Sequence, residues 1–222
     1  MDVVDAIRSR KSIRGFKPDP VPKEVLREIL DIARSAPSAM NAQPWEVTVV
    51  TGEVLANINK AIIELMNAGV ERHPDLPFIP YEGIYRQRQV DLAIQIFKLM
   101  GIAREDKAKR AEWGQRGFRF FDAPAAIIVS IDRSVDKILS HLDIGVFIQT
   151  ICLAALNYGL GTCIEDQGIM FPEVLRKFTS IPESNEILIS IAIGYPDWDF
   201  PANKLETERE PLEKFVTWCG FA

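Results

Sequence analysis

Hydrophobic and polar positions alternate along the chain with periods that separate helices from strands. Between positions 21 and 34, apolar residues such as Leu26, Ile29 and Ala33 recur every three or four positions, and Pro22 suits a first helical turn. Farther on, a short β-branched run is followed by a second stretch with helical spacing. The pattern therefore predicts a helix over 21–34, a strand over 47–51 and a helix over 53–67.

Three later segments are apolar at most positions. The runs 125–131 and 187–193 are rich in isoleucine and valine, which is typical of strands covered on both faces, so we expect helices on each side of the sheet. The stretch 139–156 contains His141 and Asp143, which would be costly in a bilayer, so we interpret it as a buried helix and expect no membrane partner. Its apolar residues point in nearly every direction, so its own domain or a partner subunit must cover it on all sides.

Two segments differ in character from the rest of the chain. Positions 69–117 begin with prolines and continue as charged helical sequence, which we interpret as an excursion from the core and a candidate lid. Positions 197–222 lose periodicity and end in the apolar string FVTWCGF, which predicts a tail that packs on a partner subunit. No repeat or flexible linker divides the sequence, so 1–222 is expected to form a single domain.

Composition narrows the possible functions. The chain has 222 residues, of which 47% are hydrophobic, and a formal net charge of −5, which disfavours nucleic acid as a partner. Its three cysteines form no C-x-x-C pair, and with two histidines no metal-ligand cluster of recognisable spacing is present. The start MDVVDAIRSRK has no secretory pattern, so we expect a cytoplasmic protein. The sequence also lacks a lysine-containing phosphate loop, a complete dinucleotide fingerprint and the common hydrolase motifs.

Two short strings carry the candidate chemistry. The string SRKSIRGF places Arg10, Lys11, Ser12 and Arg14 within five residues, and these donors are suited to a phosphorylated cofactor, although a solvated basic patch has the same composition. The loop APSAMNAQPW at 36–45 is stiffened by two prolines and directs polar side chains at a fixed place, although a helix stop and turn use the same residue types.

Read together, these strings resemble the amino-terminal signature of the nitroreductase family. LDIGVFIQTICLAALNYGLGTC resembles the family's central helix and following strand, and IPESNEILISIAIGYPD resembles its last sheet strand. The middle of the chain and REPLEKFVTWCGF look most like the branch of nitrobenzoate and nitroaromatic reductases. The resemblance implies an α+β fold in which a mixed central sheet is flanked by helices. It also implies an interlocked homodimer with an extended C-terminal tail, and flavin mononucleotide (FMN) in the interface.

The resemblance also implies a role for individual residues. Arg10, Lys11 and Ser12 would hold the phosphate and ribityl chain, and Arg14 would lie beside the pyrimidine end, where negative charge develops on reduction. Arg209 would close on the phosphate, and Arg88 falls where this branch approaches the flavin rim. Pro37, Ser38, Met40 and Asn41 would come from the other subunit. The backbone of Ile164, Glu165, Asp166 and Gln167 would face flavin N5 and O4.

The sequence departs from the family pattern at two positions. Thr207 stands where some members have a second basic residue near the phosphate, and Gly117 stands where the close branch often has asparagine. Cys163 would lie near the flavin, and we interpret it as a small buried hydrophobe. His141 is interpreted as a core histidine with satisfied hydrogen bonds.

The implied activity is hydride transfer from NADH or NADPH, through flavin N5, to a small nitroaromatic or quinone-like acceptor by a ping-pong mechanism, with no obligatory catalytic side chain. Aromatic residues of the candidate lid would stack on the substrate, and Arg86, Arg88 or Arg104 would attract a carboxylate. Two alternatives stay open: reductive dehalogenation of halophenols on the same scaffold, and a flavin-binding redox module without turnover. The lid aromatics are Phe78, Tyr81, Tyr85 and Trp113.

Overall fold

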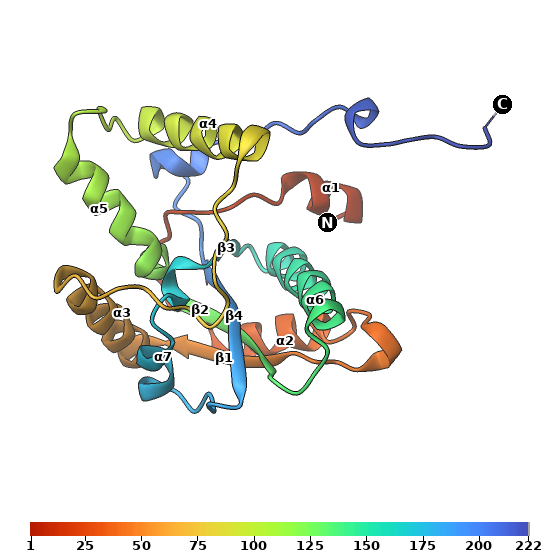
Figure 1. Ribbon diagram of the computed structural model, residues 1–222, viewed down its shortest axis with the longest axis horizontal. Helices are drawn as coiled ribbons and strands as arrows, with labels where there is room; N and C mark the ends of the chain where they lie inside the picture. The colour runs from red at the N-terminus through yellow and green to blue at the C-terminus, as the bar shows by residue number, and fades with distance from the viewer. Residues whose placement is uncertain (222) are drawn as a thin grey trace.

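A four-stranded sheet forms the centre of the computed structural model, which describes residues 1–221 (Figure 1). Its strands are β1 (Glu46–Thr51), β2 (Ala125–Asp132), β3 (Gly161–Glu165) and β4 (Asn185–Gly194). They follow the order β1-β2-β4-β3, and each neighbouring pair runs antiparallel. We expected a mixed sheet, but within residues 1–221 parallel pairing is limited to the isolated bridge between Ser12 and Thr162. The mixed sheet was implied by the family resemblance, and the pattern of side chains could not correct it, because alternation specifies the two faces of a strand and not its direction.

Helices cover both faces of the sheet, as the apolar runs predicted. Side chains of β2 alternate between two cores: Ile127 and Val129 enter one, whereas Ala126 and Ile128 enter the other. The helices on the first face are α2 (Lys23–Ala33) and α6 (Lys137–Asn157), and those on the second are α3 (Gly52–Asn67) and α7 (Pro172–Phe178). The predicted helices over 21–34 and 53–67 and the strand over 47–51 are therefore confirmed.

Three more helices lie toward the β3 edge of the sheet (Figure 1). They are α1 (Val3–Ser9), α4 (Gly83–Leu99) and α5 (Lys107–Phe118). The last two form the excursion that the charged helical sequence predicted. α4 contacts the 3₁₀ turn Pro201–Lys204, and α5 contacts the turn Gln167–Ile169, which directly follows β3. The excursion therefore returns to the end of β3, where the sequence placed part of the site.

The long helix α6 is only partly covered by its own chain. Ile144, Phe147 and Ile151 are buried, but Ile138 and Leu142 are 76% and 65% exposed. By length and composition this helix could also cross a membrane, although 44% of its apolar window is buried inside the domain. His141 on this helix has no hydrogen-bond partner at Nε2, so its interpretation as a satisfied core histidine was wrong.

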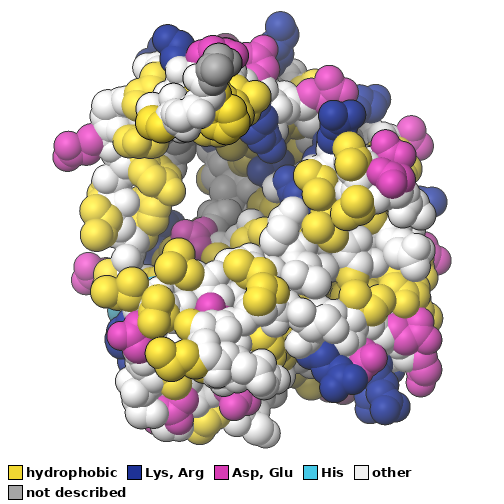
Figure 2. Space-filling view, turned by 90° about the vertical axis from the view of Figure 1, so that its right-hand side faces the viewer, with side chains coloured by type: hydrophobic (Ala, Val, Ile, Leu, Met, Phe, Trp, Pro, Cys, Tyr) yellow, Lys and Arg dark blue, Asp and Glu magenta, His cyan; other side chains and the backbone are white. Residues whose placement is uncertain are grey.

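The chain beyond Leu205 leaves the body as an extended tail with one 3₁₀ turn at Leu212–Lys214 (Figure 1). Its aromatic side chains are exposed: Phe215 and Trp218 are each 66% accessible and Phe221 is 76% accessible. Figure 2 views the side from which the tail emerges and shows a deep hollow bordered by hydrophobic side chains. The tail therefore makes few contacts with its own domain.

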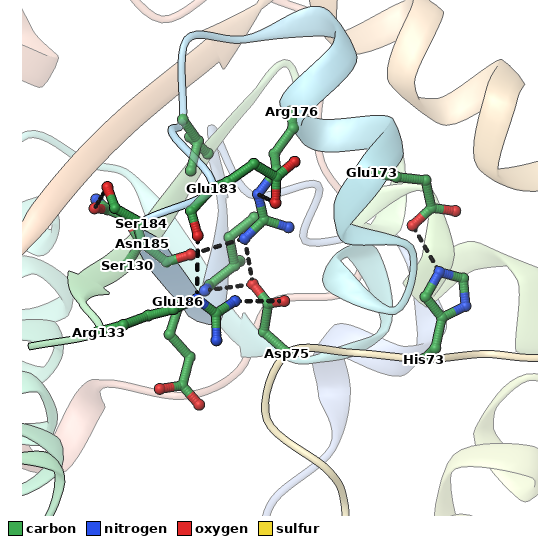
Figure 3. Close-up of polar contacts among 12 residues, drawn as sticks. His73, Asp75, Ser130, Arg133, Glu173, Arg176, Glu183, Ser184, Asn185 and Glu186 are labelled. Atoms are coloured by element: carbon green, nitrogen blue, oxygen red, sulfur yellow. Dashed lines mark hydrogen bonds and ion pairs between the residues drawn. The ribbon is translucent and has the colours of Figure 1, made fainter.

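A polar cluster ties the start of the excursion to the body (Figure 3). Oδ1 of Asp75 lies 3.0 Å from Nη2 of Arg133, and Oδ2 lies 2.6 Å from Nη2 of Arg176. Oδ2 also accepts a hydrogen bond from the N–H of Ile187 at 2.9 Å. Burial alone would raise the pKa of Asp75, but the hydrogen bonds from Arg176 and Ile187 and the two guanidinium charges hold it below its ordinary value. Asp75 is therefore a charged anchor beside the start of β4.

His73 makes a second tie two residues earlier. Its ring Nε2 lies 2.8 Å from Oε2 of Glu173 on α7 (Figure 3). The backbone N–H of His73 donates to the carbonyl of Met170 at 3.2 Å. The hydrogen bond to the carbonyl of Glu71 raises the pKa of His73, and Glu173 adds to that effect. The part of the excursion that could move relative to the core therefore begins after Asp75.

Candidate active site

The basic segment near the start of the chain lies along the open edge of β3. The N–H of Ile13 donates to the carbonyl of Thr162 at 2.9 Å, and the N–H of Lys17 donates to the carbonyl of Tyr195 at 2.8 Å. Arg14 lies between these two attachments. Because both ends of this short segment are tied to the sheet or to the residue that follows β4, the backbone that carries Arg14 has a fixed position.

Asn203 fixes that backbone from the other side. Its Oδ1 accepts hydrogen bonds from the N–H groups of Arg14 and Gly15 at 2.7 and 3.2 Å. Its Nδ2 donates to the carbonyls of Gly15 and Asp197, each at 2.7 Å. The side chain is 1% exposed, so all four bonds are shielded from water. Sequence analysis missed this residue, because nothing in its local pattern distinguishes it from an ordinary turn asparagine.

Phe200 fills the space beside Gly15. A Cβ atom added to Gly15 would lie 2.2–2.5 Å from atoms of the Phe200 side chain. The guanidinium of Arg116 lies 4.7 Å from the centroid of the same ring, and its Nη2 donates to the carbonyl of Arg14 at 3.3 Å. Trp113 stacks near the ring with a centroid distance of 6.5 Å and an interplanar angle of 17°. Helix α5 thus supports the segment that carries Arg14.

A pocket of about 430 Å³ opens between this segment, α4, α5 and the end of β3. Arg14 and the residues at 164–167 line it together, so the structure unites two parts of the chain that the sequence assigned to one site. Because β3 is an edge strand that the basic segment pairs with only at Thr162, the outward backbone groups beyond Thr162 are available to a ligand. Helix α5 adds the ring of Trp113 to the wall.

The side chain of Glu165 turns away from the pocket and into the protein. Its Oε2 accepts from the N–H of Gly168 at 2.8 Å, and Oε1 accepts from the hydroxyl of Ser190. Burial raises the pKa of Glu165 to about 7, although the bonds from Ser190 and Gly168 oppose the shift. The side chain of Glu165 is therefore engaged inside the protein, and contact of its backbone with a flavin stays a prediction.

The side chain of Gln167 lies against α5. Its Nε2 donates to the carbonyl of Gly114 at 3.4 Å, and a Cβ atom added to Gly117 would lie 1.7 Å from its Oε1. Gly117 therefore provides the space that Gln167 occupies.

The loop at 36–45 is strained and anchored on α6. Met40, Asn41 and Gln43 have φ angles of 52°, 57° and 48°, a conformation that costs energy in residues other than glycine. The N–H of Ala39 donates to both carboxylate oxygens of Asp143, at 3.1 and 3.2 Å. None of the four residues predicted here, Pro37, Ser38, Met40 and Asn41, lines the pocket of its own chain. Met40 is fully exposed at 100%, so the loop presents its side chain outward.

Four predicted cations lie outside the pocket in the single chain. Arg10 and Lys11 precede the attachment at Thr162 and are half-buried. Nη2 of Arg88 lies 2.8 Å from Oε1 of Glu210 in the tail. Nη1 of Arg209 donates to the carbonyl and hydroxyl of Thr207 at 3.0 and 2.7 Å. Contact of these cations with a cofactor stays a prediction.

Cys163 lies in the wall of the pocket but is a buried thiol. It is 3% exposed, and burial raises its pKa to about 12. A thiol with that pKa is not a nucleophile at neutral pH, which agrees with its interpretation as a small hydrophobe. Cys152 is likewise buried and its pKa is raised by burial.

The aromatic residues of the excursion divide into two groups. Trp113 lines the pocket and packs beside Phe200. Phe78, Tyr81 and Tyr85 form a series of neighbouring rings, with centroids 5.8 and 6.4 Å apart, and all are more than half exposed. Of the four predicted lid aromatics, only Trp113 lies at the pocket in the described chain.

Comparison with known proteins agrees with this geometry. The profile described as the nitroreductase family matches residues 7–195. A nitrobenzene nitroreductase of Ectopseudomonas oleovorans is 36% identical over 217 residues, covering 96% of this chain and 95% of that protein. A 4-nitrobenzoate reductase of Pseudomonas putida is 34% identical and covers 99% of this chain and 97% of its own length.

A solved structure shares the whole fold. The crystal structure of an FMN and NADPH-dependent nitroreductase from Sphigopyxis sp. strain HMH aligns over 100% of both chains with a TM-score of 0.94 and 28% identity. The resemblance seen in the sequence is thus confirmed by family, fold and coverage. This chain belongs to the nitroreductase family.

Proposed function

We propose that this chain is an FMN-dependent oxidoreductase that passes hydride from NADH or NADPH to a small nitroaromatic or quinone-like acceptor in a ping-pong cycle. The observation that carries the proposal is the pocket that Arg14 lines together with residues 164–167, at the end of β3 and directly after it. The relatives named above, which act on nitrobenzene and 4-nitrobenzoate by name, support the same substrate class.

The residues present fit FMN. Arg10, Lys11 and Arg14 form no ion pair with a carboxylate within residues 1–221, so their charges are available to a phosphate and an electron-rich ring. Bound FMN would supply the hydride chemistry at N5. Arg14 would stabilise the negative charge of the reduced ring, and the edge amides of β3 would donate to it. No protein nucleophile is needed, which agrees with the protonated thiol of Cys163.

The proposal includes a homodimer. Within one chain, Leu142 of α6 and the tail aromatics are exposed, and the strained loop with Met40 faces away from its own pocket. A second copy would cover these surfaces and would bring its loop to the pocket. We therefore propose a second copy of this chain and small molecules as the partners. The net charge of −5 gives no support for nucleic acid, and the unpaired cysteines fit the cytoplasm.

The oligomer is tested by Leu142→Arg, which places a charge on the exposed face of α6. We expect a monomer in analytical ultracentrifugation and loss of retained FMN. The control is Ile32→Arg, because Ile32 is 44% exposed on α2. A Leu142→Arg protein that stays dimeric and yellow would contradict this interface.

The activity is tested by an absorbance spectrum of the purified protein and anaerobic titration with NADH and NADPH. We expect a flavin spectrum that bleaches with at least one donor and returns with nitrobenzene. A protein that neither retains nor binds FMN would exclude the proposal. A flavin that is bleached by the donor but is not reoxidised by nitroaromatics or quinones would favour the redox module without turnover. A flavin that is reoxidised by iodotyrosine alone would favour reductive dehalogenation.

We also propose that the predicted segment 69–117 contains a lid, whose mobile part lies between Asp75, which is fixed by ion pairs, and α5, which packs against the segment that carries Arg14. Exchanging this segment for that of a relative should change which acceptors are reduced. An unchanged acceptor profile would rule the lid out.

A further inference from the structure

A groove between α4 and the start of α5 gathers positive charge in a protein whose net charge is −5. It has a volume of about 780 Å³. Its cations are Arg86, Lys98, Arg104 and Arg110. Its apolar floor includes Val90 and Phe97, and the guanidinium of Arg110 lies 4.3 Å from the centroid of the Phe97 ring. The groove thus offers both a flat apolar surface and several cations.

The positive charges of this groove are not neutralised within the chain. No carboxylate of residues 1–221 forms an ion pair with any of the four cations. Of the nearby acids, Asp91 accepts from Nε2 of Gln87 at 2.8 Å and Asp106 pairs with Lys109 at 3.6 Å, whereas Glu105 and Glu112 form no ion pair with the groove cations within the described residues. Four cations that repel one another in one groove favour an external anion.

The groove adjoins the candidate active site. Gln89, Ala93 and Phe97 line both the groove and the pocket that contains Arg14. A molecule whose ring occupies the pocket can therefore extend a charged group past these shared residues into the groove. The groove itself contains neither Arg14 nor the edge of β3, so it is distinct from the place assigned to FMN.

We propose that this groove binds the anionic group, a carboxylate or a phosphate, of the molecule whose ring reacts in the adjacent pocket. The inference rests on the proposed function and specifies its ligands: an aromatic acid as acceptor, or a phosphate of the dinucleotide donor. Guanidinium and ammonium groups recognise both anions by charge-assisted hydrogen bonds. Phe97 and Arg110 provide the flat surface over which the connecting part of the ligand passes.

The test is the double variant Lys98→Gln with Arg104→Gln, which removes two charges from the groove and keeps the shared wall residues. The matched control is Lys60→Gln with Lys107→Gln. It removes two charges from exposed positions that do not line the groove. Holoenzyme kinetics compare 4-nitrobenzoate with neutral nitrobenzene as acceptor, and NADPH with NADH as donor. A ping-pong enzyme gives separate kcat/KM values for donor and acceptor.

We expect the groove variant to lower kcat/KM by roughly fivefold or more for a charged ligand, relative to the control, with nitrobenzene unchanged. A loss confined to 4-nitrobenzoate assigns the groove to an acceptor carboxylate. A loss confined to NADPH assigns it to the additional phosphate of that donor, and an equal loss for both donors assigns it to their diphosphate. Losses no larger than those of the control for every charged ligand would overturn the inference.

A direct titration separates this inference from the proposed function. Calorimetry measures the Kd of benzoate and of adenosine 2′,5′-bisphosphate for the purified protein, with no turnover required. We expect at least one probe to bind the groove variant roughly fivefold more weakly than the control, with a difference that shrinks as salt rises. Equal Kd values for the groove variant and the control would overturn the assignment of the groove as an anion site, even where the protein binds FMN and reduces nitrobenzene. If the protein does not bind FMN but the groove variant binds a probe more weakly than the control, the anion site is supported and the proposed function is excluded.

Discussion

The side-chain amide of Asn203 pairs with the backbone of Gly15 as a neighbouring strand would. Its Oδ1 accepts from the N–H of Gly15 at 3.2 Å, and its Nδ2 donates to the carbonyl of the same residue at 2.7 Å. The same Oδ1 accepts from the N–H of Arg14 at 2.7 Å. A residue near the end of the chain thereby sets the direction in which Arg14 enters the pocket.

Replacing Asn203 with alanine should destabilise the protein and weaken flavin binding. The change leaves the N–H groups of Arg14 and Gly15 without partners in a buried place, whereas the two carbonyls keep backbone N–H partners, and we expect a loss of about 2–4 kcal/mol in the free energy of unfolding. Urea unfolding at a fixed protein concentration measures it, with Asn67→Ala as control because Asn67 is exposed. Equal midpoints for Asn203→Ala and the wild type would show that these four bonds do not hold the segment.

Gly15→Ala should lower the stability of the protein because the added methyl group would clash with Phe200. The new Cβ would lie 2.2–2.5 Å from the Phe200 side chain, and Arg116 and Trp113 on the other sides restrict movement of that ring. We expect a loss of about 1–3 kcal/mol, as for other overpacked sites. Combining Gly15→Ala with Phe200→Leu should recover part of the loss in a double-mutant cycle. Gly114→Ala meets no atom within 4 Å and should not destabilise its helix. Additive losses without recovery would contradict the steric explanation.

Arg14→Ala should lower the reduction potential of the bound flavin more than it lowers flavin affinity. Removal of the cation leaves the reduced ring less stabilised than the oxidised ring, because negative charge builds up only on reduction. We expect a potential about 30 mV lower or more, which for a two-electron couple corresponds to roughly 1.4 kcal/mol. Anaerobic spectroscopic titration against reference dyes measures it. The control is Arg34→Ala, since Arg34 pairs with Asp31 on an exposed turn. An unchanged potential would remove Arg14 from this role.

Glu165→Gln should make the protein more stable at high pH and leave it nearly unchanged at low pH. Burial raises the pKa of Glu165 from 4.5 to about 7, so the folded state binds a proton that the unfolded state releases. The stability contributed by this group is complete below pH 4.5 and is lost as the pH rises through about 7. The glutamine amide cannot ionise and keeps an acceptor for the N–H of Gly168. We expect a gain of about 1–3 kcal/mol at pH 8 and a flatter stability profile between pH 5 and 8. Parallel profiles for variant and wild type would show that Glu165 does not titrate there.

Much of the fold follows from the periodicity of apolar residues. The continuous runs that became β2 and β4 require cover on both faces, and two helices on each face provide it. Strand direction did not follow, because side-chain alternation is the same for parallel and antiparallel neighbours. The partly exposed α6 shows a second limit: an apolar helix must be covered, but its sequence does not say whether by its own chain or by another.

The site residues that lie in short, recognisable strings of the sequence could be predicted. Arg14 belongs to the string SRKSIRGF and residues 164–167 directly follow GLGTC, which are strings that carry the family resemblance, and the pocket contains both parts. Asn203 and Asp143 escaped prediction because each acts on backbone far away in sequence: Asp143 binds the N–H of Ala39, and Asn203 binds Arg14 and Gly15. A side chain that binds a distant backbone group leaves no periodic or spacing signal in the sequence.

The exposed aromatic tail also has a consequence for folding in the cell. Under the proposed homodimer, a folded chain that has not yet met a second copy displays Phe215, Trp218 and Phe221 together with the unpaired edge of β1. Such surfaces promote misassembly when chains are crowded, and the risk ends only when they are covered. The yield of active protein after dilution from denaturant should therefore be highest at an intermediate chain concentration, where two folded chains dimerise fast enough and aggregation is still slow.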